Sequence, residues 1–247
     1  MKQIEVGILN VNAIKDAEKA MVCAARLTQR GHKIKTLNDF IELYNRPYTP
    51  ELVRNLLALP HPTIQKLGVI NVVVVGASRR FLAQITRHQN EVKFMSASLQ
   101  YSDYSDSSDF TIPKSIINNP ELTELYLNNC KESMDNYKTL IEDFGIDNDA
   151  AGYMAPQGLR NILIISATPY QWKHMISQRV CRRNTEETRY VMLKIWNELC
   201  KHSDMFLNCG PFCMKDKCEE GKMTCGKPLN KDATALDILN EDFKEIF

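Results

Sequence analysis

The chain has almost no net charge and contains no long hydrophobic run. Its 31 Lys and Arg side chains nearly balance 30 Asp and Glu, leaving a net charge of +1, so an anion site requires a local cluster. The longest apolar strand-like run, residues 69–75, is far too short to span a bilayer, and no basic segment leads into an apolar one at the start. We therefore expect a cytoplasmic protein with no membrane partner.

Internal repeats and a disulfide framework are also missing. The eight cysteines are spread over 247 residues, whereas a disulfide scaffold is typical of small secreted chains. Four of them lie within helical patterns and are expected to pack as reduced, small apolar residues: Cys23, Cys130, Cys181 and Cys200. With 44% hydrophobic and 25% charged residues, the composition is that of a soluble globular protein with one sizeable core.

Short apolar segments alternate irregularly with helical patterns, which predicts an α+β fold. Predicted strands cover residues 4–11, 67–75 and 160–166, and the second has β-branched residues on both faces, as a strand covered on both sides would. Predicted helices cover residues 13–30, with Asn12 as N-cap, and residues 51–59, 78–86, 122–144, 170–179 and a stretch through Leu199. The polar residues 105–120 are predicted to form a mobile loop. We expect one domain over residues 1–205 and a cysteine-containing tail over 206–247.

The tail concentrates the other four cysteines in a Gly- and Lys-rich segment: Cys209, Cys213, Cys218 and Cys225. Four thiolates would close a structural zinc site and fold a segment that is too polar to have a core of its own. Their spacing is not the usual paired Cys-x2-Cys, so an iron–sulfur cluster and free thiols stay open as alternatives.

Residues 87–102 are the most informative segment for function. Arg87 and His88 end a helical stretch, and a hydroxyl-rich loop, residues 96–108, follows with almost no apolar side chains. An arginine fork with many small donors suits the phosphates and sugar of a nucleotide. A solvated basic helix end is the alternative.

A second block carries four arginines within eleven positions: Arg179, Arg182, Arg183 and Arg189. Asn184 and Glu187 resemble a capping box, which would place the first three arginines just before a helix N-terminus. Such a position already attracts anions, so cations there indicate an anionic partner. The alternative is that Glu186 and Glu187 pair with the arginines in a surface network.

Both blocks are similar to motifs of the flavin-dependent thymidylate synthases. The family signature is Arg-His-Arg, seven residues, then Ser, and here Arg87-His88-Gln89 opens it and the run from Ser98 to Ser102 closes it. The spacer is one residue longer, and Gln stands for Arg at 89 and at 100. Residues 60–63 match a flavin-contacting element, and residues 183–189 match a second family stretch with two Thr substitutions. Gly152 stands where the family has an arginine that helps to hold the nucleotide phosphate.

The resemblance implies a mostly antiparallel central sheet with flanking helices, and a homotetramer with shared active sites. It implies FAD, with NADPH and methylenetetrahydrofolate as co-substrates, in the reductive methylation of dUMP to dTMP. Arg179 would be catalytic by polarising the pyrimidine. The flavin would be held by His61, Thr63, Arg87, His88, Gln89 and His174. The nucleotide would be held by Gln84, Ser98, Leu99, Gln100, Arg179 and Arg183.

Two other functions stay open at this point. Gln100 and Gly152 remove two charges from the expected phosphate site, which leaves room for another pyrimidine nucleotide or an unphosphorylated nucleoside, unless Arg160, Lys173 or Arg182 compensates. A non-enzymatic nucleic-acid-binding protein would use the arginine cluster and a zinc-stabilised tail, but the near-zero net charge disfavours nucleic acid as a partner.

Overall fold

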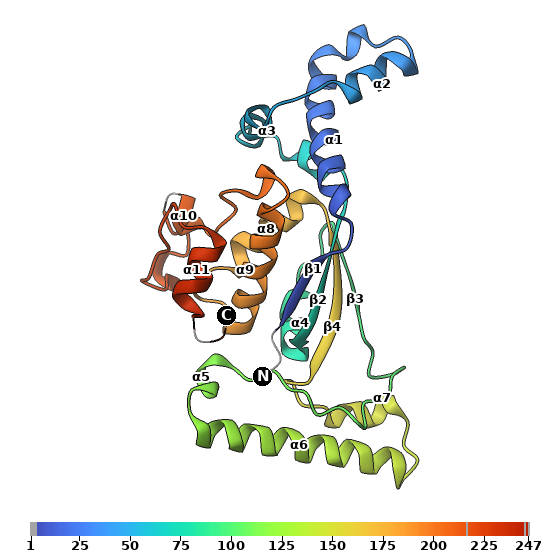
Figure 1. The fold of residues 1–247 in the computed structure, drawn as a ribbon, viewed down its shortest axis with the longest axis vertical. Coiled ribbons are helices and arrows are strands. Elements are labelled where there is room, and N and C mark those ends of the chain that lie inside the picture. The colour runs from blue at the N-terminus through green and yellow to red at the C-terminus, as the bar shows by residue number, and fades with distance from the viewer. Residues whose placement is uncertain (1–3, 216, 245, 247) are drawn as a thin grey trace.

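A four-stranded antiparallel sheet forms the centre of the computed structural model, which describes residues 4–215, 217–244 and 246 (Figure 1). The strand order is β1 (Glu5–Ile8), β2 (Ile70–Ser78), β4 (Arg160–Ala167), β3 (Val92–Ser96). All three neighbouring pairs are antiparallel. The predicted α+β class with an antiparallel sheet is therefore confirmed.

One face of this sheet is buried and the other is uncovered within the chain. Side chains alternate between the two faces along a strand. Val72 and Val74 of β2 and Ile165 of β4 are therefore fully buried, while Ile162 is 52% exposed and Met95 of β3 is 71% exposed. The prediction that the second strand is covered on both faces is wrong for a single chain.

Helices pack against the buried face and join one large core. They are α1 (Val11–Arg30), α4 (Arg79–Ile85), α8 (Pro169–Arg179) and α9 (Glu186–Cys200). α9 is buried on most sides because the sheet, α8 and the tail surround it, and Leu193, Ile195 and Leu199 are fully buried. Among the described residues no helix is both long and apolar enough to cross a membrane.

Further helices extend the molecule beyond the two ends of the sheet (Figure 1). At one end lie α2 (Leu37–Asn45), α3 (Pro50–Leu57) and the 3-10 turns η1 (Gly31–Lys33) and η2 (Pro62–Lys66). At the other lie α5 (Lys114–Ile117), α6 (Pro120–Glu142), α7 (Asn148–Ala151) and η3 (Gly152–Met154). Phe110, Met134, Tyr137 and Leu159 form a second small core there. The short helix α5 lies inside the segment predicted as a loop.

The tail packs against the rest of the chain. The turn η4 (Asp204–Phe206) leads into it, and it contains α10 (Phe212–Lys215), η5 (Gly221–Met223) and α11 (Ala235–Asp242). Leu229, Ile238, Leu239 and Phe243 are buried in the same core as the sheet, and α11 lies along α9. The described part of the tail therefore shares its core with the residues before it.

Two predicted helix caps are wrong. α1 begins at Val11, so Asn10 is the N-cap, and its amide side chain instead bonds Val69 O and Asn71 N at the start of β2. The N-cap of α9 is Thr185 rather than Asn184. Glu187 makes no capping box because its carboxylate accepts hydrogen bonds from Ser78 N and Ser78 Oγ, at the junction of β2 and α4.

Candidate functional site

A hydrogen bond between Arg179 and His88 joins the two informative blocks of the sequence. Arg179 ends α8 and His88 follows α4, and Arg179 Nε donates to His88 Nε2 at 2.8 Å. His88 is only 8% exposed, and burial, followed by the charges of Arg179 and His174, lowers its pKa to about 4. The ring is therefore neutral near pH 7, with its proton on Nδ1, because Nε2 is the acceptor.

Neutral partners hold the guanidinium of Arg179. Nε of Arg179 donates to His88, and its Nη1 donates to Asn184 Oδ1 at 3.3 Å. The amide of Asn184 is itself anchored by a 2.7 Å bond to Gln178 O. Burial and then the nearby charge of Arg87 lower the pKa of Arg179. Two cations thus lie close together, and the partners that fix Arg179 do not neutralise it. This arrangement suits an anionic or electron-rich ligand.

The other three arginines of the block are neutralised by carboxylates of the tail. Arg182 bonds Glu241 at 2.6 Å and Asp242 at 2.9 Å, and Arg183 bonds Glu220 at 2.5 Å. The buried Arg189 pairs with Asp242 and also donates to Val180 O. Carboxylates therefore neutralise three of the four arginines, whereas Arg179, which lines the same cavity as Arg182 and Arg183, forms no ion pair among the described residues.

The predicted alternative, in which Glu186 and Glu187 pair with the arginines in a surface network, is wrong. Glu186 accepts from Ser115 N at 3.2 Å, and Glu187 is bound to Ser78. Burial raises the pKa of Glu187 although the two Ser78 bonds oppose this.

The other predicted flavin residues lie at the same end of the sheet as His88. His61 and Thr63 are exposed on η2, and Lys173 Nζ ties η2 to α8 through a 2.8 Å bond to Gln65 Oε1. The ring of His174 on α8 meets that of His88 edge-on at 5.9 Å.

Glu91 links η2 to the start of α8 at this end of the sheet. It adopts a positive φ of 54° and bonds both Lys66 of η2, at 2.6 Å, and Thr168, the N-cap of α8, at 2.8 Å. Gln89 is exposed in the turn just before it. The elements that carry His61, Thr63, Arg87, His88, Gln89 and His174 are thus brought to one end of the sheet.

The predicted nucleotide set is divided between the two ends. Arg179 ends α8 beside His88, whereas the residues that follow β3 lie at the other end. Val92 of β3 pairs with Ala167 next to α8, whereas Ser96 pairs with Leu163, and Ser98, Leu99 and Gln100 follow. A five-residue strand spans about 16 Å, so these residues are far from His88 in the same chain. Gln84 lies on α4, which runs back between the two ends.

The nucleotide end brings together further positions that the sequence singled out. Gln100 N donates to Ser98 Oγ at 3.1 Å, and a Cβ on Gly152 would lie 3.2 Å from Leu99 Cβ. Arg160 begins β4 at this end, and Gly76, with a φ of 83°, leaves the space that its guanidinium occupies.

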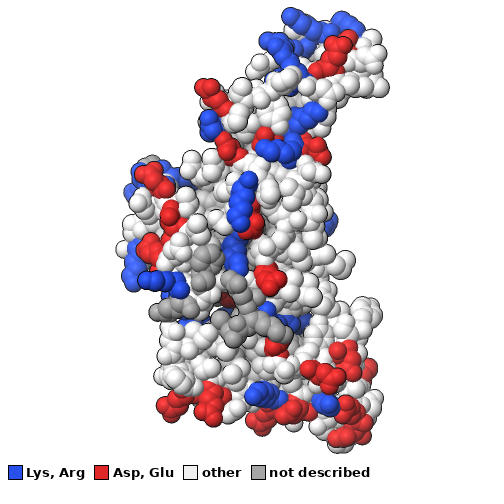
Figure 2. All heavy atoms as spheres, viewed as in Figure 1, with Lys and Arg blue, Asp and Glu red and all other residues white. Residues whose placement is uncertain are grey.

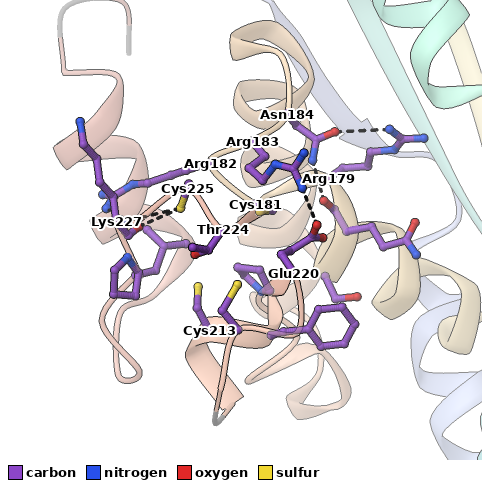
Figure 3. Close-up of a pocket in the computed structure, with 17 residues that line it drawn as sticks. Arg179, Cys181, Arg182, Arg183, Asn184, Cys213, Glu220, Thr224, Cys225 and Lys227 are labelled. Atoms are coloured by element: carbon purple, nitrogen blue, oxygen red, sulfur yellow. Dashed lines mark hydrogen bonds and ion pairs between the residues drawn. The ribbon is translucent and has the colours of Figure 1, made fainter. Parts of the chain in front are cut away.

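The predicted metal set is not brought together. Cys209 is 1% exposed and directs its thiol toward Met205 O and Leu207 O. Cys213, Cys218 and Cys225 instead line a cavity together with Cys181 (Figure 3). Among the described residues, no group of three or more His, Cys, Asp or Glu is placed to hold one metal ion. Sequence spacing gave no signal for Cys181, because it lies in the arginine block far from the tail.

Comparisons with known proteins cover the part of the chain that carries both motif blocks. The family model described as thymidylate synthase complementing protein matches residues 10–203. A flavin-dependent thymidylate synthase of Thermococcus onnurineus is 25% identical over 177 residues, covering 68% of this chain and 71% of that protein. One from Geobacter sulfurreducens is 23% identical over 216 residues, covering 86% and 90%.

Two solved structures share the fold. A UMP/dUMP methylase, PolB, from Streptomyces cacaoi, bound with 5-Br dUMP, superposes with a TM-score of 0.67 at 15% identity, covering 85% of this chain and 95% of the other. Thymidylate synthase X from Helicobacter pylori, with FAD and dUMP, gives a TM-score of 0.59 at 16% identity, covering 83% and 98%.

Proposed function

The chain belongs to the thymidylate synthase complementing protein family, that of the flavin-dependent thymidylate synthases, and on this premise we propose that it methylates dUMP to dTMP. FAD is the proposed cofactor, with methylenetetrahydrofolate as the one-carbon donor and NADPH as the reductant. We propose a cytoplasmic enzyme. The observation that carries the proposal is the Arg179–His88 bond, because it joins the two family motifs in one electropositive site.

The residues at the Arg179 end of the sheet fit a flavin dinucleotide. Arg87 would supply a cation for the diphosphate oxygens, and it lies near enough to Arg179 for its charge to lower the pKa of that group. His88 and His174 offer ring donors and flat surfaces, and His61 and Thr63 add exposed donors on the adjacent η2. Gln89 completes the proposed set. When bound, the flavin would supply the hydride, so tetrahydrofolate would be released without oxidation.

The chain's own contribution would be to position and polarise the pyrimidine. His88 and Asn184 fix the half-buried Arg179 guanidinium before the substrate arrives. A fixed cation against a pyrimidine carbonyl stabilises the negative charge that develops on the ring, and this effect is strongest where water is excluded. The proposed nucleotide set is unchanged: Gln84, Ser98, Leu99, Gln100, Arg179 and Arg183. Arg183 is bound to Glu220, so it would have to exchange that carboxylate for the substrate.

We propose that complete sites form between subunits of a homotetramer. Within one chain, β3 separates Ser98 from His88, so each chain would offer two half-sites to its neighbours. The uncovered face of the sheet supports this assembly. Val75 pairs with Ile162, and Ile164 pairs with both Val73 and Met95, which makes a continuous apolar surface across three strands. Exposed apolar surface of this kind is characteristic of subunit contacts.

The first test is the absorption spectrum of the purified protein, recorded before and after heat release of any ligand. We expect a flavin spectrum, and then dTMP formation from dUMP, methylenetetrahydrofolate and NADPH, detected by mass spectrometry. A colourless protein that does not take up added FAD would overturn the proposal.

A different pyrimidine substrate is the second candidate. The neutral Gln100 and Gly152 each remove one charge-assisted phosphate bond, at a cost of about 1.5–3 kcal/mol per bond. Arg182 is held by Glu241 and Asp242, and Lys173 lies at the flavin end, so Arg160 is the compensating cation nearest to Ser98. Parallel reactions with dUMP, UMP and deoxyuridine separate the candidates. Methylation of UMP or deoxyuridine in preference to dUMP would establish the second.

The third candidate, nucleic-acid binding, loses its main support. Tail carboxylates neutralise Arg182, Arg183 and Arg189. Acidic side chains also gather over α6 on the face shown in Figure 2.

A further inference from the structure

A cavity of about 420 Å³ lies between the tail and the loop that joins α8 to α9 (Figure 3). Four cysteines line it. Cys181 comes from the α8–α9 loop, Cys213 from α10, and Cys218 and Cys225 from the segments on either side of η5. The α8–α9 loop and the tail, which are far apart in the sequence, therefore bring four thiols to one space.

We propose that Cys181, Cys213, Cys218 and Cys225 bind an iron–sulfur cluster of the four-iron class. Four cysteine thiolates are the complete ligand set of such a cluster. The cavity adjoins the candidate active site, because Arg179 and Arg183 line it and both belong to the proposed nucleotide set.

The spread of the thiols favours a cluster over a zinc ion. Four thiolates at about 2.3 Å from one Zn²⁺ lie about 3.8 Å from one another. No such group occurs in the described part of the chain, since the cysteines line the wall of a cavity and do not meet at a point. In a four-iron cluster each thiolate binds a different iron, so the irons and sulfides occupy the space among the ligands.

Backbone N–H groups are already directed at two of the four sulfurs. Lys227 N donates to Cys225 Sγ at 3.4 Å. The backbone N–H of Arg183 donates to the thiol of Cys181. In both cases the donor is two residues after the cysteine. Such bonds stabilise thiolates and are a main way in which proteins tune iron–sulfur clusters.

The charge of the cavity wall also suits this ligand. Arg179 and Lys227 line it and form no ion pair among the described residues, and a cluster with four thiolate ligands is an anion. Arg182 and Arg183 line it too, but tail carboxylates already neutralise them. One carboxylate, that of Glu220, lines the cavity too, but it is paired with Arg183 at 2.5 Å.

Iron and acid-labile sulfide should be measured in the full-length protein after anaerobic reconstitution with ferrous iron and sulfide. We expect about four of each per chain. Electron paramagnetic resonance of the dithionite-reduced protein supplies a second readout, because flavin absorbance hides the cluster in the visible range. One zinc per chain without sulfide, or no bound metal, would overturn the proposal.

Single substitutions then test the ligand set. Cys181→Ser and Cys213→Ser should lose most of the iron and sulfide, whereas Cys209→Ala should retain both, because Cys209 points away from the cavity. Loss in Cys209→Ala with retention in Cys181→Ser would contradict the proposed set. FAD content and circular dichroism are recorded for each variant, so that loss of the cluster is distinguished from unfolding or loss of the flavin. If a variant does not fold, the metal content of the unsubstituted protein still decides the question.

Discussion

At the scale of single residues, the proposed role of Arg179 depends on the shape of its guanidinium group as well as on its charge. Its guanidinium meets His88 through Nε and Asn184 through Nη1, and an ammonium group cannot reproduce this planar pair of contacts. Arg179→Lys is expected to lower kcat for dTMP formation about 100-fold, as loss of one fixed donor to a developing charge does. Steady-state kinetics with saturating dUMP measures this.

Arg54→Lys is the matched control, because Arg54 forms an exposed ion pair with Asp204 and belongs to neither proposed residue set. An equal fall in kcat in the two variants would remove Arg179 from its proposed role.

The neutral ring of His88 predicts a loss of stability in acid. Its pKa is about 4 in the folded protein and is near 6.5 in an unfolded chain, so the unfolded state binds more protons between these values. The free energy of unfolding should therefore fall as the pH is lowered from about 6.5 to 4, by on the order of 3 kcal/mol from this group. Urea unfolding of the protein and of His88→Gln measures the difference. Equal pH dependence of the two proteins would contradict the prediction.

At the scale of elements, Asp242 fastens α11 to the loop before α9 and to α9 itself. Its carboxylate bonds both Arg182 and the buried Arg189. Asp242→Asn would leave Arg189 without its charge partner, so we expect a loss of about 3 kcal/mol in the free energy of unfolding. Thermal and urea unfolding at pH 7 measure it.

Glu241→Gln is the control for this pair. Glu241 also bonds Arg182, but its side chain is 65% exposed, and exposed ion pairs contribute about 1 kcal/mol or less. Burial alone would raise the pKa of Asp242, but Arg182 and Arg189 together lower it. The advantage of Asp242 over Asn should therefore be present at neutral pH and disappear in acid. An advantage that persists in acid would contradict the electrostatic explanation.

Local patterns predicted the elements better than the contacts between them. The β-branched runs and helical periods gave β2, β4, α1, α6 and α8 to within a few residues. The motifs that include His88 and Arg179 were found from short-range spacing. Spacing could not show that Glu187 binds Ser78, which lies 109 positions earlier. Nor could it show that tail carboxylates form ion pairs with Arg182, Arg183 and Arg189. Cys181 was missed as a cavity residue for the same reason, because only tertiary packing brings it to the tail.

At the scale of the whole molecule, the uncovered sheet face should control assembly. Ile164→Glu places a charge in the centre of this surface, where Ile164 pairs with Val73 and Met95. Burying an unpaired carboxylate between subunits is costly, so the variant should form smaller species and lose flavin and activity together. Light scattering coupled to gel filtration measures the mass.

Leu37→Glu serves as the control, since Leu37 is an equally apolar, exposed residue on α2, away from the sheet. Unchanged mass in Ile164→Glu would show that this face is not the subunit contact.

The position of β3 between the two half-sites also has a genetic consequence. If complete sites form across subunits, two inactive alleles, one defective at Ser98 and one at Arg179, belong to different complementation groups within one gene. Mixed oligomers would then contain some pairings in which both halves are intact, so a cell carrying both alleles would regain part of the activity that each allele lacks.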